Sequence, residues 1–203
     1  MFYEPKKGYP FDENPFAALV FPRPIGWISS KNNDGQINLA PYSFFNAIAT
    51  IPPMVVIGPG GYSKSGNNKD TLLNIKNNPE FVCNFVSWDV KDIMNESSYS
   101  FDNNESEIEK LNIETENSTM VSIPRVKLSP AHFECTLFKI IDLPSDSKGN
   151  PNHLIIGNII GINISDKIIK NNRIDIGELK PISRMGYDEY ALINTIFSMK
   201  RPK

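Results

Sequence analysis

The residues best suited to chemistry lie in the segment 40–47, APYSFFNA. Its aromatic, hydroxyl, amide and small side chains follow one another without the strict alternation of an ordinary strand: Tyr42, Ser43, Phe44, Phe45, Asn46 and Ala47. Pro41 stands in the same segment, and a proline in a strand is typical of a sheet edge or a bulge. We therefore expect this segment to form one wall of a site for a flat, amphipathic ligand.

A glycine-rich loop at 58–71, GPGGYSKSGNNKDT, follows a strand-like run and leads into a helix-like run, an arrangement that suggests phosphate binding. Gly61 and Gly66 have the spacing that opens a P-loop, but Asn67 and Asn68 occupy the places of its lysine and hydroxyl residue. The GxGxxG pattern of dinucleotide sites does not occur in this loop either. Neither nucleotide fingerprint is therefore satisfied.

The start of the predicted helix offers a different kind of anion site. Asp70 is a good N-cap residue, so we expect the backbone N–H groups from Thr71 onward to be free for a ligand. Lys69 adds a positive charge beside the Thr71 hydroxyl. These three residues could hold a phosphate group, although an ordinary capped surface helix explains the same pattern.

Short runs rich in Ile, Val and Phe predict the strands that position these residues. The first two, 25–30 and 42–49, flank the turn residues 33–35 (Asn-Asp-Gly) and predict a hairpin. Further strands are predicted at 54–58, 80–86, 133–143 and 153–164, and short helices at 70–76, 88–94 and 105–111. Because these helices are too few to alternate with the strands, the pattern favours an antiparallel sheet or barrel.

Residues 89–122 are acidic, polar and poor in large apolar side chains. Two interpretations are open for such a long connection. It forms either a solvated excursion on one side of the barrel or a lid over the ligand.

The composition is that of an ordinary globular domain. The chain has 203 residues, 40% of them hydrophobic, so we expect a single domain over residues 1–203. Its 21 basic and 23 acidic residues give a formal net charge of -2, which predicts no binding to nucleic acid or to an anionic membrane. No apolar run approaches the roughly 20 residues of a membrane span, and residues 1–15 lack the apolar core of a secretory signal, so we expect a cytoplasmic protein.

Residue types that form common metal and catalytic sites are sparse. Cys83 and Cys135 each lie in a strand-like apolar run, which predicts buried thiols and no disulfide. Two cysteines and two scattered histidines make no metal-ligand pattern, so no metal is expected. The chain shows no Ser-His-Asp or Cys-His arrangement, and we assign no catalytic residue.

Eight separate blocks, taken in order, resemble the flavin reductase-like, FMN-binding split-barrel family. They are RPIGWISS, NLAPYSFFNA, the Pro52-Pro53 pair, KDTLLNI, EFVCNFV, the Pro124-Arg125-Val126 turn with LSPAHFECTL, HLIIGNIIGI and RMGYDEYALINTIFSMKRP. Together they run from about Pro22 to Pro202. The resemblance implies a mainly β fold, an antiparallel Greek-key split β-barrel with a few short helices. It also implies a homodimer that holds FMN near the subunit interface.

The resemblance assigns roles to the residues introduced above. Residues 42–47 would line the isoalloxazine and ribityl groups, with Ser43 and Asn46 as polar contacts. The phosphate end would be held by Lys69, Asp70 and Thr71.

The resemblance points to three further residues: Trp27 and His153 fall where the family often approaches the flavin, and Arg184 lies in the C-terminal block. Arg184 could reach a site across the dimer. Trp27 could equally be a core aromatic and His153 could cap a turn. His132 is expected to be structural, and Arg23 to pair with a surface carboxylate.

The function implied is transfer of reducing equivalents from NADH or NADPH through flavin N5 to an acceptor, either a small molecule or a second flavin. Because the flavin performs the chemistry, such a protein needs no acid or base of its own. Two alternatives stay open. One is an FMN electron carrier reduced by a protein partner, and the other is a barrel that binds a peptide edge without catalysis.

Overall fold

The structure is a computed structural model that describes residues 1–61, 68–101, 105–146 and 148–202. Strands dominate it: β1 Gly26–Lys31, β2 Ile37–Tyr42, β3 Phe45–Thr50, β4 Pro53–Ile57, β5 Glu80–Phe85, β6 Thr115–Glu116, β7 Arg125–Val126, β8 Ala131–Leu143, β9 Asn152–Ile164, β10 Ile169–Lys170, β11 Arg173–Ile174, β12 Ile182–Arg184 and β13 Tyr190–Leu192. The helices are short: η1 Pro5–Lys7, α1 Phe16–Leu19, α2 Asp70–Asn77, η2 Trp88–Val90, α3 Lys91–Glu96, α4 Glu107–Lys110, η3 Asp166–Ile168 and α5 Ile176–Leu179.

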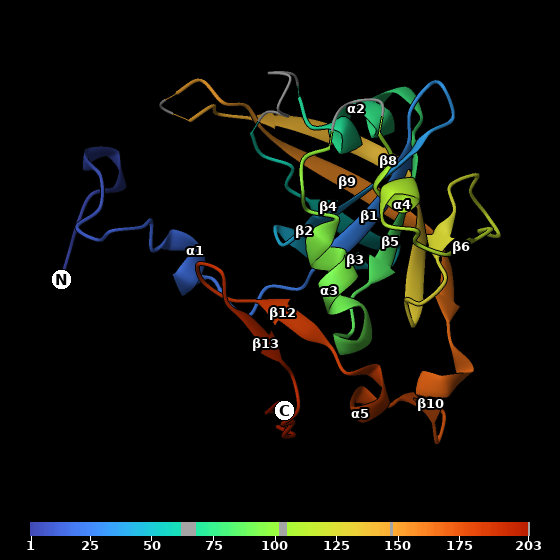
Figure 1. The fold of residues 1–203 in the computed structure, drawn as a ribbon. Coiled ribbons are helices and arrows are strands. Elements are labelled where there is room, and N and C mark those ends of the chain that lie inside the picture. Colours follow the sequence, from blue (N-terminus) through green and yellow to red (C-terminus); the bar gives the residue numbers. More distant parts are fainter. Residues whose placement is uncertain (62–67, 102–104, 147, 203) are drawn as a thin grey trace.

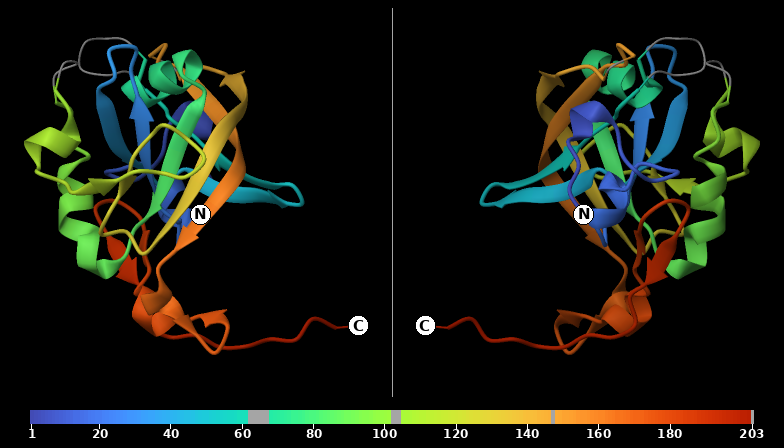
Figure 2. Two further views of the ribbon diagram at one scale, coloured as in Figure 1. Left: turned by 90° about the vertical axis from the view of Figure 1, so that its right-hand side faces the viewer. Right: turned by 90° about the vertical axis from the view of Figure 1, so that its left-hand side faces the viewer.

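Seven strands form one sheet in the order β2-β1-β5-β8-β9-β4-β3, and every pair is antiparallel. The two edge strands, β2 and β3, are consecutive in the chain and are joined only by Ser43 and Phe44. The chain therefore passes directly from one edge of the sheet to the other, which requires the sheet to curl into a barrel (Figure 2). The predicted mainly β class, a split barrel with short helices, is confirmed.

The prediction of a single strand at 42–49 is wrong. The turn after β1 is tight: Asn32 N–H donates to Gln36 O at 3.0 Å, and Gly35 has a φ of +87°, which glycine adopts without strain. The hairpin partner of β1 must therefore begin immediately after the turn, and Lys31 pairs with Ile37. The chain leaves that strand at Tyr42 and starts β3 three residues later.

Strand β1 is buried on both faces, which links two hydrophobic cores. Ile28 packs in a core with Phe81 and Ile155, residues of neighbouring barrel strands. Trp27 packs on the opposite face with Leu39 and with Met94 of α3. In Figure 1, helices α3 and α4 lie over this second face, so the segment after β5 covers one side of the barrel.

A buried carboxylate holds the loop that follows β6. Glu134 on β8 has no exposed surface and accepts hydrogen bonds from the Thr119 N–H at 3.0 Å, from the Met120 N–H and from Asn163 Nδ2. Burial alone would raise the pKa of Glu134, but these bonds outweigh it and hold the pKa below its usual range. The charged side chain therefore anchors the loop to the barrel.

The described parts of the chain show two further points that bear on function. No helix among them is long and apolar enough to cross a membrane, and they contain no His, Cys, Asp and Glu cluster arranged to hold a metal ion. Cys83 and Cys135 are both buried, and neither forms a disulfide. Burial raises the pKa of the Cys83 thiol well above its usual range. A buried protonated thiol is a weak nucleophile.

Candidate functional site

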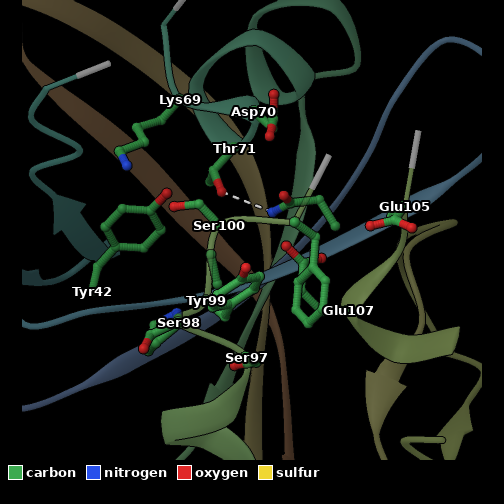
Figure 3. Close-up of a pocket in the computed structure, with 14 residues that line it drawn as sticks. Tyr42, Lys69, Asp70, Thr71, Ser97, Ser98, Tyr99, Ser100, Glu105 and Glu107 are labelled. Atoms are coloured by element: carbon green, nitrogen blue, oxygen red, sulfur yellow. Dashed lines mark hydrogen bonds between the residues drawn. The ribbon is translucent and has the colours of Figure 1, made fainter. Parts of the chain in front are cut away.

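A small polar cavity of about 120 Å³ lies between β2 and the start of α2 (Figure 3). The predicted residues Tyr42, Lys69, Asp70 and Thr71 line it together. Figure 3 shows the side chains of Tyr42, Lys69, Thr71 and Ser100 pointing toward a common space. The structure thus brings Tyr42, at the end of β2, together with the three consecutive predicted residues 69–71.

Helix α2 begins at Asp70, the first residue of the predicted helix 70–76, but its N-cap differs from the prediction. Lys69, not Asp70, occupies the N-cap position, and no side chain caps the helix. The N–H groups of Leu72 and Leu73 both donate to Lys69 O, at 2.9 and 3.2 Å, so the expectation of free amides from Thr71 onward is wrong. An anion at this helix start is therefore limited to the backbone N–H groups of Asp70 and Thr71.

Thr71 joins the helix to the sheet. Its side chain is buried, and Oγ1 accepts a hydrogen bond from Asn38 Nδ2 at 3.0 Å. The same hydroxyl takes part in a hydrogen bond with Tyr42, whose pKa is raised to about 12 mainly by burial. Both interactions fix the position of α2 against the outer face of β2.

Buried acid groups form the other side of this cavity. Glu107 is only 7% exposed, and its Oε2 accepts the Leu39 N–H at 2.9 Å. Burial, with a smaller contribution from the nearby Asp70 carboxylate, raises the pKa of Glu107 to about 7. Burial also raises the pKa of Asp70, against the effect of Lys69. This part of the cavity therefore gains or loses negative charge near neutral pH.

The sequence did not identify Glu107 or the neighbouring wall formed by residues 97–101. Both belong to residues 89–122, the polar segment that the sequence predicts to be either a solvated excursion or a lid over the ligand. The structure places residues 97–101 and Glu107 of this segment beside β2, where they line the cavity. The sequence carries no signal for this position because a glutamate in a short polar helix is usually exposed.

A larger cavity of about 600 Å³ adjoins the first, and both are lined by Pro41 and Ser98. Ser43 and Phe44, the two residues that connect the sheet edges, form part of its wall. Arg184 lines the same cavity and forms an isolated antiparallel β-bridge with Arg23. Arg184 therefore lies beside the predicted wall of its own chain.

Two arginines organise this larger cavity. Arg23 is buried and donates to Val20 O and Met185 O, each at 2.7 Å, to Ala17 O, and to Ser43 Oγ at 3.3 Å. Burial and the neighbouring Arg184 lower the pKa of Arg23. The expectation that Arg23 pairs with a surface carboxylate is wrong, because its bonds go to backbone carbonyls and to one serine.

Arg184 is held by local contacts near the C-terminal end of β12. Its guanidinium lies 4.6 Å from the ring centre of Tyr190, and Nη2 donates to Asp188 Oδ1 at 3.3 Å and to Tyr187 O. About a quarter of the side chain is exposed. It is thus oriented toward the cavity margin while keeping surface available to a ligand.

The rest of the predicted wall points elsewhere. Phe45 packs under Gly26, where an added Cβ would lie 2.7 Å from the phenyl ring, and it lines a separate small cavity. Asn46 and Ala47 are exposed on β3, and Asn46 Oδ1 accepts the Ala47 N–H at 2.9 Å. Of residues 42–47, only Tyr42, Ser43 and Phe44 line the two joined cavities.

Trp27 and His153 lie outside both cavities. Trp27 has no exposed surface, and its indole N–H donates to Ser97 Oγ at 2.8 Å, so the structure places it in the core. His153 is the second residue of β9, and its Nδ1 lies 2.9 Å from Asp142 Oδ1 on the paired strand. His132 is buried, with Nε2 donating to Val126 O at 2.8 Å.

The fold is that of the split-barrel class. It is similar to nitrilotriacetate monooxygenase component B from Bacillus cereus, with a TM-score of 0.88 and 29% identity over 98% of each chain. It is also similar to the 2-nitrobenzoate 2-nitroreductase NbaA of Pseudomonas fluorescens, with a TM-score of 0.80 and 29% identity over 92% of this chain and 88% of that one. A split-barrel protein from Shewanella frigidimarina shares the fold at 19% identity, with a TM-score of 0.79 over 92% and 90% of the two chains.

Sequence comparison narrows the class to a family. The family model of the flavin reductase like domain matches residues 18–174. An uncharacterized protein of Aquifex aeolicus is 35% identical over 176 residues, 86% of each chain. The uncharacterized protein YwrF of Bacillus subtilis is 31% identical over 188 residues, 92% of this chain and 91% of YwrF. The chain therefore belongs to the flavin reductase-like, FMN-binding split-barrel family.

Proposed function

We propose that this protein binds FMN along the two joined cavities and works as an oxidoreductase that takes reducing equivalents from NADH or NADPH. The proposal rests on one observation: the polar cavity at the start of α2 adjoins a larger cavity that is bordered by Ser43, Phe44 and Arg184. Family membership supports it. Two similar structures, at 29% identity, also belong to proteins named for oxidoreductase reactions, a monooxygenase component and a nitroreductase.

The residues present fit the phosphate end of FMN. Lys69 supplies a positive charge, and the N–H groups of Asp70 and Thr71 stand at the positive end of the α2 dipole. The carboxyl groups of Asp70 and Glu107 oppose an anion in the same cavity. Because the pKa of Glu107 is about 7, this group can take up a proton near neutral pH, which reduces the repulsion.

The larger cavity fits the ring end. FMN supplies the hydride chemistry when it is bound. Phe44 offers an exposed aromatic face, and Ser43, which already accepts a bond from Arg23 Nε, offers a hydroxyl proton to a ring acceptor. Arg184 adds a partly exposed guanidinium that suits the phosphate groups of a nicotinamide nucleotide. These residues bind and orient the reactants, and none is required to act as an acid or a base.

The phosphate assignment is tested by comparing FMN with riboflavin, which lacks the phosphate. Lys69→Ala should weaken FMN binding about tenfold and leave riboflavin affinity nearly unchanged, since one charge-assisted contact is lost. Lys76→Ala is the matched control, because Lys76 is an exposed lysine in the last turn of the same helix. Flavin fluorescence titration measures the affinities of the wild type and both variants for each ligand. If Lys69→Ala lost as much affinity for riboflavin as for FMN, Lys69 would not be a phosphate contact.

Turnover is tested by anaerobic rapid mixing of the FMN-loaded protein with NADH or NADPH. Loss of the oxidised flavin absorbance should be faster than for free FMN in the same buffer. If neither nucleotide reduces the bound flavin faster, the protein is an electron carrier that requires a protein donor. If the purified protein binds no flavin at all, the remaining alternative is a barrel that acts as an interaction module.

A homodimer and a cytoplasmic location complete the proposal. The β3–β4 hairpin projects from the barrel in Figure 2, and its tip carries Ile51, which is 93% exposed. Phe197 and Met199 in the C-terminal segment are also largely exposed. Apolar side chains on projecting segments are typical of surfaces that pack on a partner. Light scattering should return about twice the 22.9 kDa of one chain, and a monomeric mass with flavin bound would contradict the dimer.

A further inference from the structure

Two carboxyl groups line the polar cavity of the proposed phosphate site without a cationic partner (Figure 3). Asp70 and Glu107 form no ion pair within the described parts of the chain, whereas Glu105 in the same cavity is paired with Lys110. Among the described residues that line the cavity, Lys69 carries the only positive charge. An anion that enters therefore meets more negative than positive charge when both carboxyl groups are ionised.

Glu107 is the more deeply buried of these two acids, and it is fixed in the cavity wall. Its Oε2 accepts the Leu39 N–H at 2.9 Å. The preceding residue, Ser106, donates from Oγ to Ile37 O at 2.6 Å, which ties the start of α4 to β2. Glu107 is thus held on both sides of its own backbone and cannot turn toward solvent when an anion binds. Protonation of its carboxyl is the change that would lower the repulsion.

The titratable and charged groups around Glu107 are Lys69 and Asp70 of α2, Tyr42 of β2, Tyr99 of the segment 97–101, and Glu105 and Lys110, which are paired with each other. Glu107 changes charge near neutral pH, because burial, with a smaller contribution from Asp70, raises its pKa to about 7. Tyr42 stays neutral in that range, since burial raises its pKa to about 12. Glu107 is therefore suited to gain a proton when an anion binds.

We infer that Glu107 couples binding of the FMN phosphate to uptake of a proton, so that the phosphate is held tightly when this carboxyl is neutral and weakly when it is charged. This coupling rests on the proposed function, in which the cavity holds the phosphate. A neutral carboxyl adds no negative charge beside the ligand. The bound phosphate in turn disfavours the carboxylate, and linkage requires the two effects to be equal in size.

The range from about pH 7 to 8.5 isolates this effect. A phosphate monoester has a second pKa of about 6, so FMN is already largely dianionic there. A negative charge several ångströms away raises the pKa of a buried carboxyl by about one to two units. Starting from a pKa of about 7 for Glu107, FMN affinity should fall about fourfold to tenfold over this range. At pH 7 about half a proton should be taken up per FMN.

Two measurements on the full chain test the coupling. Flavin fluorescence titration at several pH values between 7 and 8.5 gives the affinities for FMN and for riboflavin, which lacks the phosphate. Calorimetric titration with FMN at pH 7 in two buffers of different ionisation enthalpy counts the protons taken up. FMN affinity should fall with rising pH, and riboflavin affinity should stay constant. A constant FMN affinity, no proton uptake, or the same pH dependence for riboflavin would overturn the inference.

A variant identifies the group that takes up the proton. Glu107→Gln keeps an acceptor for the Leu39 N–H but does not titrate, so its FMN affinity should not change over this range. It should lie within about twofold of the wild type at pH 7 and about tenfold above it at pH 8.5. Glu109→Gln is the matched control, because Glu109 is exposed on the same helix and does not line the cavity. This control should keep the wild-type pH dependence, and the same dependence in Glu107→Gln would overturn the inference.

Thermal unfolding shows whether each variant is folded, and the proton count of the wild type decides the question alone if Glu107→Gln is not. Lys69→Ala separates a failure of the coupling from a failure of the proposed function. If Lys69→Ala weakens FMN selectively while wild-type affinity does not change with pH, the phosphate site stands and the coupling is wrong. If Lys69→Ala weakens FMN no more than riboflavin, the cavity is not the phosphate site, and both are wrong.

Discussion

Replacing Glu107 with glutamine should remove a pH-dependent loss of stability. The native protein raises the pKa of this carboxyl from 4.5 to about 7, because burial disfavours the charged form. The folded chain therefore binds the proton more tightly than the unfolded chain does. The free energy of unfolding should consequently fall as the pH rises from about 4.5 to about 7, and this group should cause no further change above that range.

The size of the effect follows from the same values. The step from 4.5 to about 7 corresponds to at most about 3 kcal/mol in the free energy of unfolding. Glutamine carries no charge at any pH, and its side-chain oxygen can still accept the Leu39 N–H. At pH 8 the Glu107→Gln variant should be more stable than the wild type by up to about 3 kcal/mol, and near pH 4.5 the two should be similar.

Urea unfolding of both proteins at several pH values between 4.5 and 8, followed by tryptophan fluorescence, measures this difference. Titrating groups that do not interact with Glu107 contribute equally to both proteins, so the difference between them reports Glu107 together with its interaction with Asp70. Glu109→Gln is the control, because Glu109 is exposed on the same helix and does not line the cavity. A Glu107→Gln difference that is constant across the range, or lower stability of the variant at pH 8, would refute the reasoning.

Three further changes test the architecture. Glu134→Gln should destabilise the fold by about 2 to 4 kcal/mol in urea unfolding, because the charge-assisted bonds to the loop after β6 are lost. This contribution is complete above pH 4.5 and should disappear as the pH falls through the lowered native pKa, so an equal difference at acid pH would contradict it. Gly157→Ala should cost about 1 to 3 kcal/mol, since the new Cβ would lie 2.3 Å from the buried Phe81 ring, and an unchanged melting temperature would show that the core yields freely. Trp27→Phe should cost about 1 kcal/mol, by the loss of the bond to Ser97, while FMN affinity stays constant; a selective loss of FMN binding would place Trp27 at the flavin.

The local pattern of the sequence was sufficient for the class of fold. Runs of β-branched and aromatic residues marked the longer strands of the sheet, and the Asn-Asp-Gly turn at 33–35 marked the first hairpin. These features depend on residues close together in the chain, so they can be read without knowledge of the fold. The ordered family blocks added the split barrel, which the sheet order and the comparisons confirm.

Details at the ends of elements were less predictable. The sequence predicted Asp70 as the N-cap of α2, whereas Asp70 is the first helical residue and Lys69 is in the capping position. It also continued one strand through Ser43 and Phe44, where the chain in fact changes from one edge of the sheet to the other. Aromatic and small polar residues suit a strand and such a connection equally well, and the pairing partners decide between them.

Only the tertiary structure decided which of the predicted residues share a space. Tyr42 lines one cavity together with Lys69 and Thr71 because α2 packs against β2. Arg184 lines the other cavity together with Ser43 because β12 pairs with the chain at Arg23. The acidity of Glu107 also arises from the fold. Burial and long-range pairing remove water from particular side chains. The sequence shows the type of each side chain, but only the fold determines which side chains are shielded from water.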